Sequence, residues 1–150
     1  MPLRHPWLND LLPYAIAAKS RWPGMRVGCC LAQAALETGY GRRPIGGHNL
    51  WGLKDLSWNP GKILVWTHEW NAKEKRYVPV QEAFEDFATP EEAFDAYGRL
   101  VTNSPTYADA REHTDLRLYV FALAKRWATD PTYAKKVWVI IEKEGLIGLD

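Results

Sequence analysis

The chain has 150 residues, of which 47% are hydrophobic and 25% charged, and its formal net charge is +1. These values predict a single globular domain over residues 1–150 and exclude a disordered chain, because the apolar content is high and the charge nearly balanced. Nucleic acid is not an expected partner of so neutral a chain. Nor is a membrane expected, since no apolar stretch approaches the roughly 18 residues of a span.

The first third of the chain predicts two helices. One is expected over about Asn9–Lys19 and the other over about Arg26–Thr38, where apolar residues recur at helical spacing. Gly39 marks the end of the second helix, because glycine commonly follows a helix C-terminus. The adjacent Cys29 and Cys30 would point about 100° apart on that helix, so they are interpreted as two buried thiols without a disulfide.

The middle of the chain predicts a β-hairpin. The segment Pro44–Gly61 is rich in Gly, Asn and Pro, which is typical of a loop. It is followed by two segments rich in β-branched and aromatic residues, Lys62–Trp70 and Arg76–Val80, with the polar turn Asn71–Lys75 between them. We therefore expect a β insertion at about residues 55–82.

The last third predicts helices again. The segment Thr89–Glu92 is a capping box with proline at the first helical position. Asp115–Trp127 has an apolar residue at every third or fourth position, and Asp130 with Pro131 is expected to cap a last helix that ends near Glu144. The expected fold class is α+β and predominantly helical, with a small β-hairpin lobe facing a helical lobe across a cleft.

Glu37 is the first candidate for catalysis, because it falls in the last turn of a mostly apolar helix. Partial burial and the negative end of the helix dipole both raise the pKa of a carboxyl group there. A carboxylic acid that keeps its proton near neutral pH is what a general acid for glycosidic cleavage requires. Position alone leaves open the simpler interpretation of a solvated carboxylate at a helix end.

Most glycosidases need a second carboxylate. The predicted hairpin offers Glu69 on a strand and Glu74 in the turn, and in the turn a solvated charge is the expected state. Glu82, Glu85 and Asp86 follow and are further candidates, because spacing in the sequence does not choose among them.

Other kinds of catalytic site lack their motifs. The His-Glu pair at residues 68–69 is not followed by the second histidine of a zinc-protease helix, so no metal is expected. The chain has neither a nucleophile elbow nor a phosphate-binding glycine loop. Four tryptophans, Trp51, Trp58, Trp66 and Trp70, occur in the loop and hairpin. They are interpreted either as a small core or as a stacking surface for sugar rings.

Five blocks of the sequence, in order along the chain, resemble motifs of the bacterial N-acetylglucosaminidases of glycoside hydrolase family 73. This family includes flagellar-rod-type and autolysin-type enzymes. The blocks are Ala32–Gly41, Asn49–Lys54, Phe87–Val101, Ser104–Tyr107 and Ala128–Ala134. Each block alone is weak evidence, but the ordered set is specific and extends over nearly the whole chain.

The resemblance implies a lysozyme-like fold, no cofactor, and hydrolysis of the β-1,4 bond after N-acetylglucosamine in peptidoglycan. On this resemblance Glu37 is the general acid, Glu69 is the second carboxylate on the β-lobe, and Tyr133 helps to stabilise the reacting sugar. The expected substrate-binding residues are Gln33, Asn49, Trp51, Trp70 and Tyr107.

Two mechanisms remain open. If Glu69 activates a water molecule, the configuration at the anomeric carbon is inverted, and the two carboxyl groups should lie ~6.5–9.5 Å apart. If the N-acetyl oxygen of the substrate attacks instead, the configuration is retained and Glu69 positions that group. A muramidase of the same fold and an inactive glycan-binding module are the alternative functions.

Residues 1–21 lack the basic start and uninterrupted apolar run of a signal peptide. We therefore expect a protein that is made in the cytoplasm and reaches periplasmic or cell-wall peptidoglycan by another route. We also expect it to be a monomer. It would be a phage endolysin or an antibacterial effector delivered by a type VI-like machine, and the second role predicts an immunity protein that occupies the cleft. A translation start placed too far downstream is the simpler explanation of the missing signal.

Overall fold

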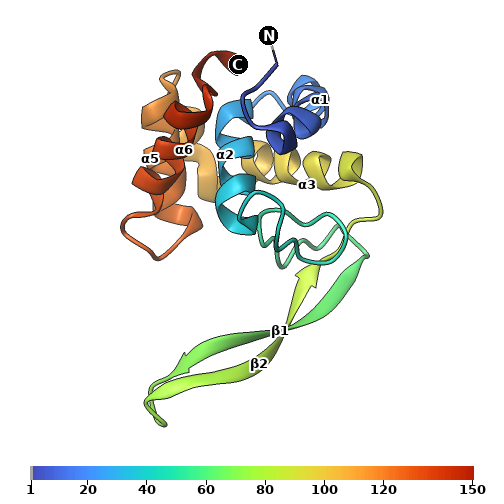
Figure 1. Ribbon diagram of the computed structural model, residues 1–150, viewed down its shortest axis with the longest axis vertical. Helices are drawn as coiled ribbons and strands as arrows, with labels where there is room; N and C mark the ends of the chain where they lie inside the picture. Colours follow the sequence, from blue (N-terminus) through green and yellow to red (C-terminus); the bar gives the residue numbers. More distant parts are fainter. Residues whose placement is uncertain (1) are drawn as a thin grey trace.

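The computed structural model describes residues 2–150 as a body of α-helices from which a β-hairpin projects (Figure 1). The hairpin consists of β1 (Lys62–Asn71) and β2 (Arg76–Glu85). The helices are α1 (Pro6–Arg21), α2 (Val27–Thr38), α3 (Pro90–Asn103), α4 (Ala108–Arg111), α5 (Leu116–Trp127) and α6 (Tyr133–Glu144), with the 3₁₀ turns η1 (Pro105–Tyr107) and η2 (Ile147–Leu149). Within residues 2–150, no helix combines the length and apolar content needed to cross a membrane.

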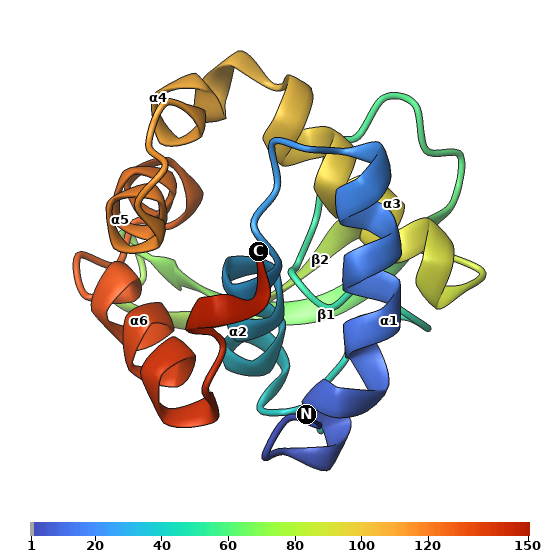
Figure 2. The same ribbon diagram turned by 90° about the horizontal axis from the view of Figure 1, so that it is seen from above.

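Helix α2 is the centre of the body. Seen from above, α1 and α3 lie on one side of it and α5 and α6 on the other (Figure 2). Every residue from Val27 to Ala35 is buried, as expected for a helix that is apolar on all faces. The buried Cys29 and Cys30 are free thiols, which confirms the sequence-based interpretation.

Local capping explains where the helices begin. Thr89 accepts a hydrogen bond from the Glu92 amide at 3.2 Å, so the predicted start of α3 is confirmed. Helix α1 begins earlier than predicted, because the His5 ring accepts a hydrogen bond from the Trp7 amide at 3.2 Å and Pro6 takes the first helical position.

The predicted cap of the last helix is wrong by two residues. Thr132 is the N-cap of α6, which therefore begins at Tyr133. Asp130 lies before the helix and accepts hydrogen bonds from the Thr132 amide at 2.8 Å and the Thr132 hydroxyl at 2.7 Å. Its side chain closes the turn that leads into the helix rather than capping the helix itself.

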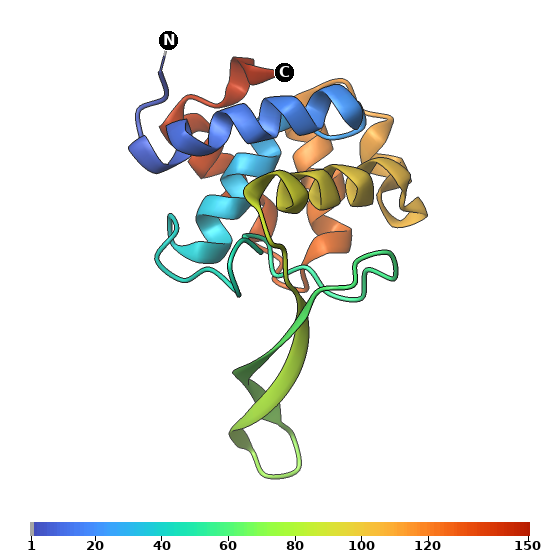
Figure 3. The same cartoon turned by 90° about the vertical axis from the view of Figure 1, so that its right-hand side faces the viewer.

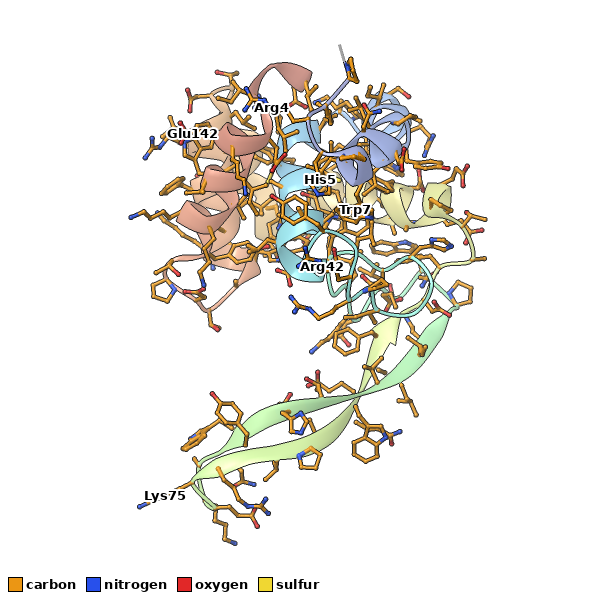
Figure 4. All side chains as sticks on the ribbon, in the orientation of Figure 1. Arg4, His5, Trp7, Arg42, Lys75 and Glu142 are labelled. Atoms are coloured by element: carbon orange, nitrogen blue, oxygen red, sulfur yellow. The ribbon has the colours of Figure 1, made fainter. Side chains whose placement is uncertain are left out.

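The predicted hairpin is confirmed, but its second strand is longer than expected. The antiparallel register runs from Lys62 opposite Glu85 to Asn71 opposite Arg76, so β2 extends beyond the predicted end at Val80. Figure 3 shows the hairpin extending away from the helices, and Figure 4 places Lys75 at its far end.

The hairpin has two different faces, because side chains alternate along each strand. The carboxylate face, as we call it, carries Glu69 on β1 and Glu82 on β2. The aromatic face carries large exposed side chains, which are Leu64, Trp66, Trp70 and Tyr77. Trp66 and Trp70 are thus exposed on the hairpin whereas Trp51 is buried, so the four tryptophans do not form one small core.

Glu85 anchors the hairpin to the body. It is 1% exposed, and its carboxylate binds Lys62 as well as the side-chain amide of Asn59 at 2.9 Å and the backbone amide of Leu56 at 3.3 Å. Its backbone carbonyl accepts a hydrogen bond from Asn49 at 2.9 Å. Buried polar groups need such partners, so this network fixes the direction in which the hairpin leaves the body.

Candidate active site

The C-terminus of α2 holds Glu37 at the edge of the helical body. The helix ends at Gly39, which adopts a left-handed conformation with φ of 60°. The neighbouring Thr38 hydroxyl donates to the Ala34 carbonyl at 2.7 Å and accepts from the Gly41 amide at 2.8 Å. These bonds fix the turn after the helix and, with it, the position of the preceding glutamate.

A small cavity of about 30 Å³ lies against Glu37. Its other lining residues come from the end of α2 and the following loop, and they are Thr38, Arg43, Ile45, Asn49, Leu50 and Gly52. This volume is far smaller than a sugar ring requires, so the structure presents a depression beside the carboxyl group rather than an enclosed pocket.

Burial raises the pKa of the Glu37 carboxyl, while a hydrogen bond from the Tyr133 hydroxyl acts in the opposite direction. That bond joins Tyr133 Oη to Glu37 Oε1 at 3.0 Å. The ion pairs found among residues 2–150 all involve other carboxylates, so no lysine or arginine holds Glu37 in its ionised form. The predicted direction of the pKa shift is thus confirmed.

Glu37 is the last member of a chain of hydrogen bonds that all run in one direction. The Tyr97 hydroxyl donates to Gln33 Oε1, Gln33 Nε2 donates to Tyr133 Oη at 3.1 Å, and Tyr133 donates to Glu37. Gln33 is completely buried, so each of these groups depends on its neighbours for its partners. The chain holds the Tyr133 hydroxyl in the orientation that donates to Glu37.

Tyr97 on α3 is not among the site residues predicted from the sequence. Its chemistry indicates a hydrogen bond, because a fully buried tyrosine, unlike a phenylalanine, needs a partner for its hydroxyl group. Gln33 is that partner. The two residues lie on different helices, α3 and α2, and only the folded structure shows that they meet.

Two carboxylates occur together on the hairpin. The hydrogen bond and the charge of Glu82 raise the pKa of Glu69. The hydrogen bond with Glu69 lowers the pKa of Glu82, and Lys54, whose ammonium lies 2.9 Å from Glu82 Oε2, adds to that effect. Glu82 is therefore the more acidic member of the pair, and Glu69 is the less acidic one.

The other carboxylates considered from the sequence have different surroundings. Glu74 lies in the turn at the tip of the hairpin, Glu85 is part of the buried anchor, and Asp86 accepts hydrogen bonds from the backbone amides of Gly47 and Phe87. Within residues 2–150, no group of three or more His, Cys, Asp or Glu side chains is arranged to hold a metal ion.

Three of the expected substrate-binding residues are buried, and the structure gives them supporting contacts instead. Trp51 is 2% exposed, and its ring lies 4.9 Å from the rings of both Phe94 and Tyr97. Asn49 binds the backbone at the hairpin anchor, and Gln33 belongs to the hydrogen-bond chain. None of the three offers a surface to a sugar in this structure, because other protein groups already cover them.

The two remaining expected residues lie in different places. Tyr107 is half-buried against Trp127, with ring centroids 5.7 Å apart. Trp70 is exposed on the aromatic face of the hairpin and pairs across the strands with Tyr77 at 5.3 Å. The structure therefore brings Glu37, Gln33 and Tyr133 together, and it places Trp70 on the opposite face of the hairpin from the carboxylates.

Comparison with known proteins identifies the family. The family model described as mannosyl-glycoprotein endo-beta-N-acetylglucosaminidase matches residues 12–146. The peptidoglycan hydrolase FlgJ of Vibrio cholerae is 35% identical over an alignment of 144 residues that covers 89% of this chain and 42% of the relative. FlgJ of Salmonella typhimurium is 32% identical over 121 residues, covering 75% of this chain and 38% of the relative. The chain thus spans less than half the length of these relatives.

Solved structures show the same fold. A mutant peptidoglycan hydrolase from Sphingomonas sp. A1 is similar with a TM-score of 0.76 and 32% identity, covering 93% of this chain and 94% of that one. The catalytic domain of the autolysin Auto from Listeria monocytogenes has a TM-score of 0.83 and 25% identity, covering 96% and 85% of the two chains. The chain therefore belongs to the glucosaminidases of glycoside hydrolase family 73 and has the predicted α+β, lysozyme-like fold of their catalytic domains.

Proposed function

We propose that this chain hydrolyses the β-1,4 bond after N-acetylglucosamine in peptidoglycan, with Glu37 as the general acid. The observation that carries the proposal is the state of Glu37. Its carboxyl group has a raised pKa, has no cationic partner among residues 2–150, and is oriented by Tyr133. The relatives named above as peptidoglycan hydrolases support the choice of substrate.

In the proposed reaction, Glu37 gives its proton to the glycosidic oxygen as the bond to the anomeric carbon breaks. The carboxylate that forms then accepts a stronger hydrogen bond from Tyr133, because bonds to an ionised acceptor are stronger than bonds to a neutral one. Tyr133 therefore favours the charge that develops during proton transfer, and it acts on the reaction through Glu37.

The second carboxylate of the proposed mechanism is Glu69, assisted by Glu82. A base on the hairpin would receive a proton from water in the inverting pathway, or would position the N-acetyl group in the retaining pathway. The Glu69–Glu82 pair suits either role, because Glu82 raises the pKa of Glu69 and so makes Glu69 the stronger base of the two. The configuration of the first-formed product, measured by NMR, distinguishes the two pathways.

Mass spectrometry of the products from purified sacculi tests the function. We expect fragments that end in N-acetylglucosamine at the reducing end, and we expect Glu37→Gln to lower the rate by ~10²–10⁴, the contribution of a general acid. Glu74→Gln, which changes a carboxylate at the hairpin tip, is the control and should keep near-normal activity. Fragments ending in N-acetylmuramic acid would show a muramidase, and binding without any product would show an inactive module.

The biological route to the substrate stays a prediction, as a phage endolysin or as a delivered antibacterial effector with an immunity protein. Expression in a bacterium with and without an added export signal tests both roles. We expect lysis when the protein is exported and none when it stays in the cytoplasm, because peptidoglycan lies outside the inner membrane. Lysis without export would contradict the need for delivery, and co-expression of a neighbouring gene product that prevents lysis would support the effector role.

A further inference from the structure

Two cavities, of about 470 and 370 Å³, lie between α3 and the loop before the hairpin, away from the buried hydrogen-bond chain. Trp58 and Arg99 line both of them, so the two cavities meet at this pair. Volumes of this size are typical of small-ligand sites. We propose that the Trp58–Arg99 site, defined by this pair and the two cavities, is a remote subsite that binds a sugar ring of the glycan strand. The inference rests on the proposed function.

The Trp58–Arg99 pair has the features of a stacking site. Trp58 is 36% exposed, and the Arg99 guanidinium lies 4.2 Å from the centre of its ring. A cation held over one side of an indole orients the ring and leaves its exposed part to an apolar ligand surface. Within residues 2–150, the half-buried Arg99 makes no hydrogen bond or ion pair, so its N–H donors are free for a ligand.

The polar groups around the pair suit sugar hydroxyls. Asp55 and Asn103 line the smaller cavity, and neither side chain has a hydrogen-bond partner among the residues that the structure describes. The Asp55 carboxylate can accept a hydrogen bond, the Arg99 guanidinium can donate one, and the Asn103 amide can do either. Together they match sugar hydroxyls, each of which both donates and accepts hydrogen bonds. Arg99 and Asp55 also balance each other in charge, which favours a neutral ligand over an ion.

The residues that line the larger cavity also favour a neutral ligand over an anion. Three of its lining residues are acidic, but each carboxylate already has a donor: Asp95 from Arg21 at 2.7 Å, Glu92 from a backbone amide at 3.2 Å, and Asp86 from a backbone amide at 3.1 Å. These acids make a purely anionic ligand unfavourable. The cavity surface is therefore apolar at Trp58 and hydrogen-bonding around it. Such a surface is complementary to a saccharide, which has apolar ring faces and hydroxyl groups at its edges.

The position of the site links it to Glu37. Gly52 lines the depression beside Glu37, and Asp55 lines the smaller cavity next to Trp58. The three residue-to-residue steps from Gly52 to Asp55 span at most ~11 Å. A glycan strand whose scissile bond lies at Glu37 would reach Trp58 only where the strand extends beyond the sugars bound beside Glu37. The site would therefore contribute more to the binding of long strands than of short ones.

Binding of N-acetylglucosamine oligomers to the Glu37→Gln variant tests the inference without turnover. We expect the hexamer to bind at least tenfold more tightly than the trimer, measured by calorimetry. Trp58→Ala should reduce the ratio of hexamer affinity to trimer affinity to nearly one. Arg99→Gln should weaken binding of the hexamer several-fold and leave binding of the trimer unchanged. Circular dichroism and thermal melting check that each variant is folded.

Arg117→Gln is the matched control, because Arg117 also lies over aromatic rings, those of Phe121 and Trp138, on another part of the body. It should keep the full hexamer-to-trimer ratio. The inference is overturned if the hexamer binds no more tightly than the trimer, or if Trp58→Ala and Arg117→Gln behave alike. Failure of the proposed function would appear separately, as an absence of products from sacculi with the unsubstituted chain.

Discussion

The helical body and the hairpin differ in how their side chains are held. In the body, α2 is buried from Val27 to Ala35, and the site residues Gln33 and Tyr133 have fixed partners. On the hairpin, Trp66 and Tyr77 are 66% and 67% exposed. A two-stranded hairpin is only marginally stable on its own, so its position depends on the few residues at its base. The proposed general acid, Glu37, therefore lies on the helical body, and the proposed second carboxylate, Glu69, lies on the projecting hairpin.

This difference determines which substitutions should affect chemistry and which should affect geometry. Changes near Glu37 alter a group whose surroundings are fixed, so they should change proton transfer and its pH dependence. Changes at the hairpin anchor should alter the position of Glu69 and Glu82 relative to Glu37. The predictions below separate these two kinds of effect.

Among the substitutions on the hairpin, the largest effect is expected from Glu69→Gln, which should lower kcat on sacculi by ~10², because it removes the carboxylate proposed to assist proton transfer or to position the substrate. Glu82→Gln should cause a smaller loss and move the pH profile to lower pH, since Glu82 raises the pKa of Glu69. If Glu74→Gln is the damaging change instead, the second carboxylate is at the tip of the hairpin and the assignment of Glu69 is wrong.

The hairpin anchor should give the next largest effect. Glu85→Ala removes the carboxylate that binds Lys62 and Asn59 and leaves the buried amide of Leu56 without its acceptor. We expect a loss of about 2 kcal/mol in the free energy of unfolding, measured by urea denaturation. Lys54→Ala, which removes an exposed ion pair, is the comparison and should cost less than about 1 kcal/mol. Equal losses would show that Glu85 is not the anchor.

Tyr133→Phe should reduce kcat by about tenfold, the rate equivalent of one hydrogen bond to a charged group. Because this bond lowers the pKa of Glu37, its removal should also move the alkaline limb of the pH–rate profile to higher pH. That shift distinguishes a residue that acts through Glu37 from one that only stabilises the fold. A reduced rate with an unmoved profile would contradict the role given to Tyr133.

The smallest effect concerns stability and pH. A carboxyl whose pKa is raised in the folded state contributes stability below its unfolded pKa, and that contribution is lost as the pH rises through the folded pKa. Glu37→Gln should therefore gain stability relative to the unsubstituted chain as the pH rises from ~4 to ~7. The gain should stay below about 1 kcal/mol, because the side chain is partly exposed. Melting curves of both proteins at several pH values measure this gain. If the stability of Glu37→Gln relative to the unsubstituted chain falls as the pH rises, the raised pKa of Glu37 is contradicted.

Much of the fold was predictable because local signals agree with the packing. The capping residue Thr89 and the glycine after α2 set helix ends that the structure confirms. The end of β2 was not predictable, because the strand beyond Val80 is held by Asn49 and Glu85 at the anchor, and such contacts join distant parts of the chain.

The candidate site was predictable in part for the same reason. The position of Glu37 at the end of an apolar helix indicated a raised pKa, which depends on local structure. The link from Tyr97 through Gln33 to Tyr133 depends on three helices meeting, and the sequence motif marked Gln33 and Tyr133 without showing that they touch. The exposure of Trp70 and the burial of Trp51 likewise depend on where the loop and hairpin fold.

A carbon-13 NMR titration of the Glu37 carboxyl, assigned by comparison with Glu37→Gln, measures the property on which the proposed chemistry depends. We predict a pKa above the ordinary glutamate value, and a further rise in Tyr133→Phe. A pKa at or below the ordinary value in the unsubstituted chain would mean that Glu37 has lost its proton at working pH, and it would contradict its assignment as the acid.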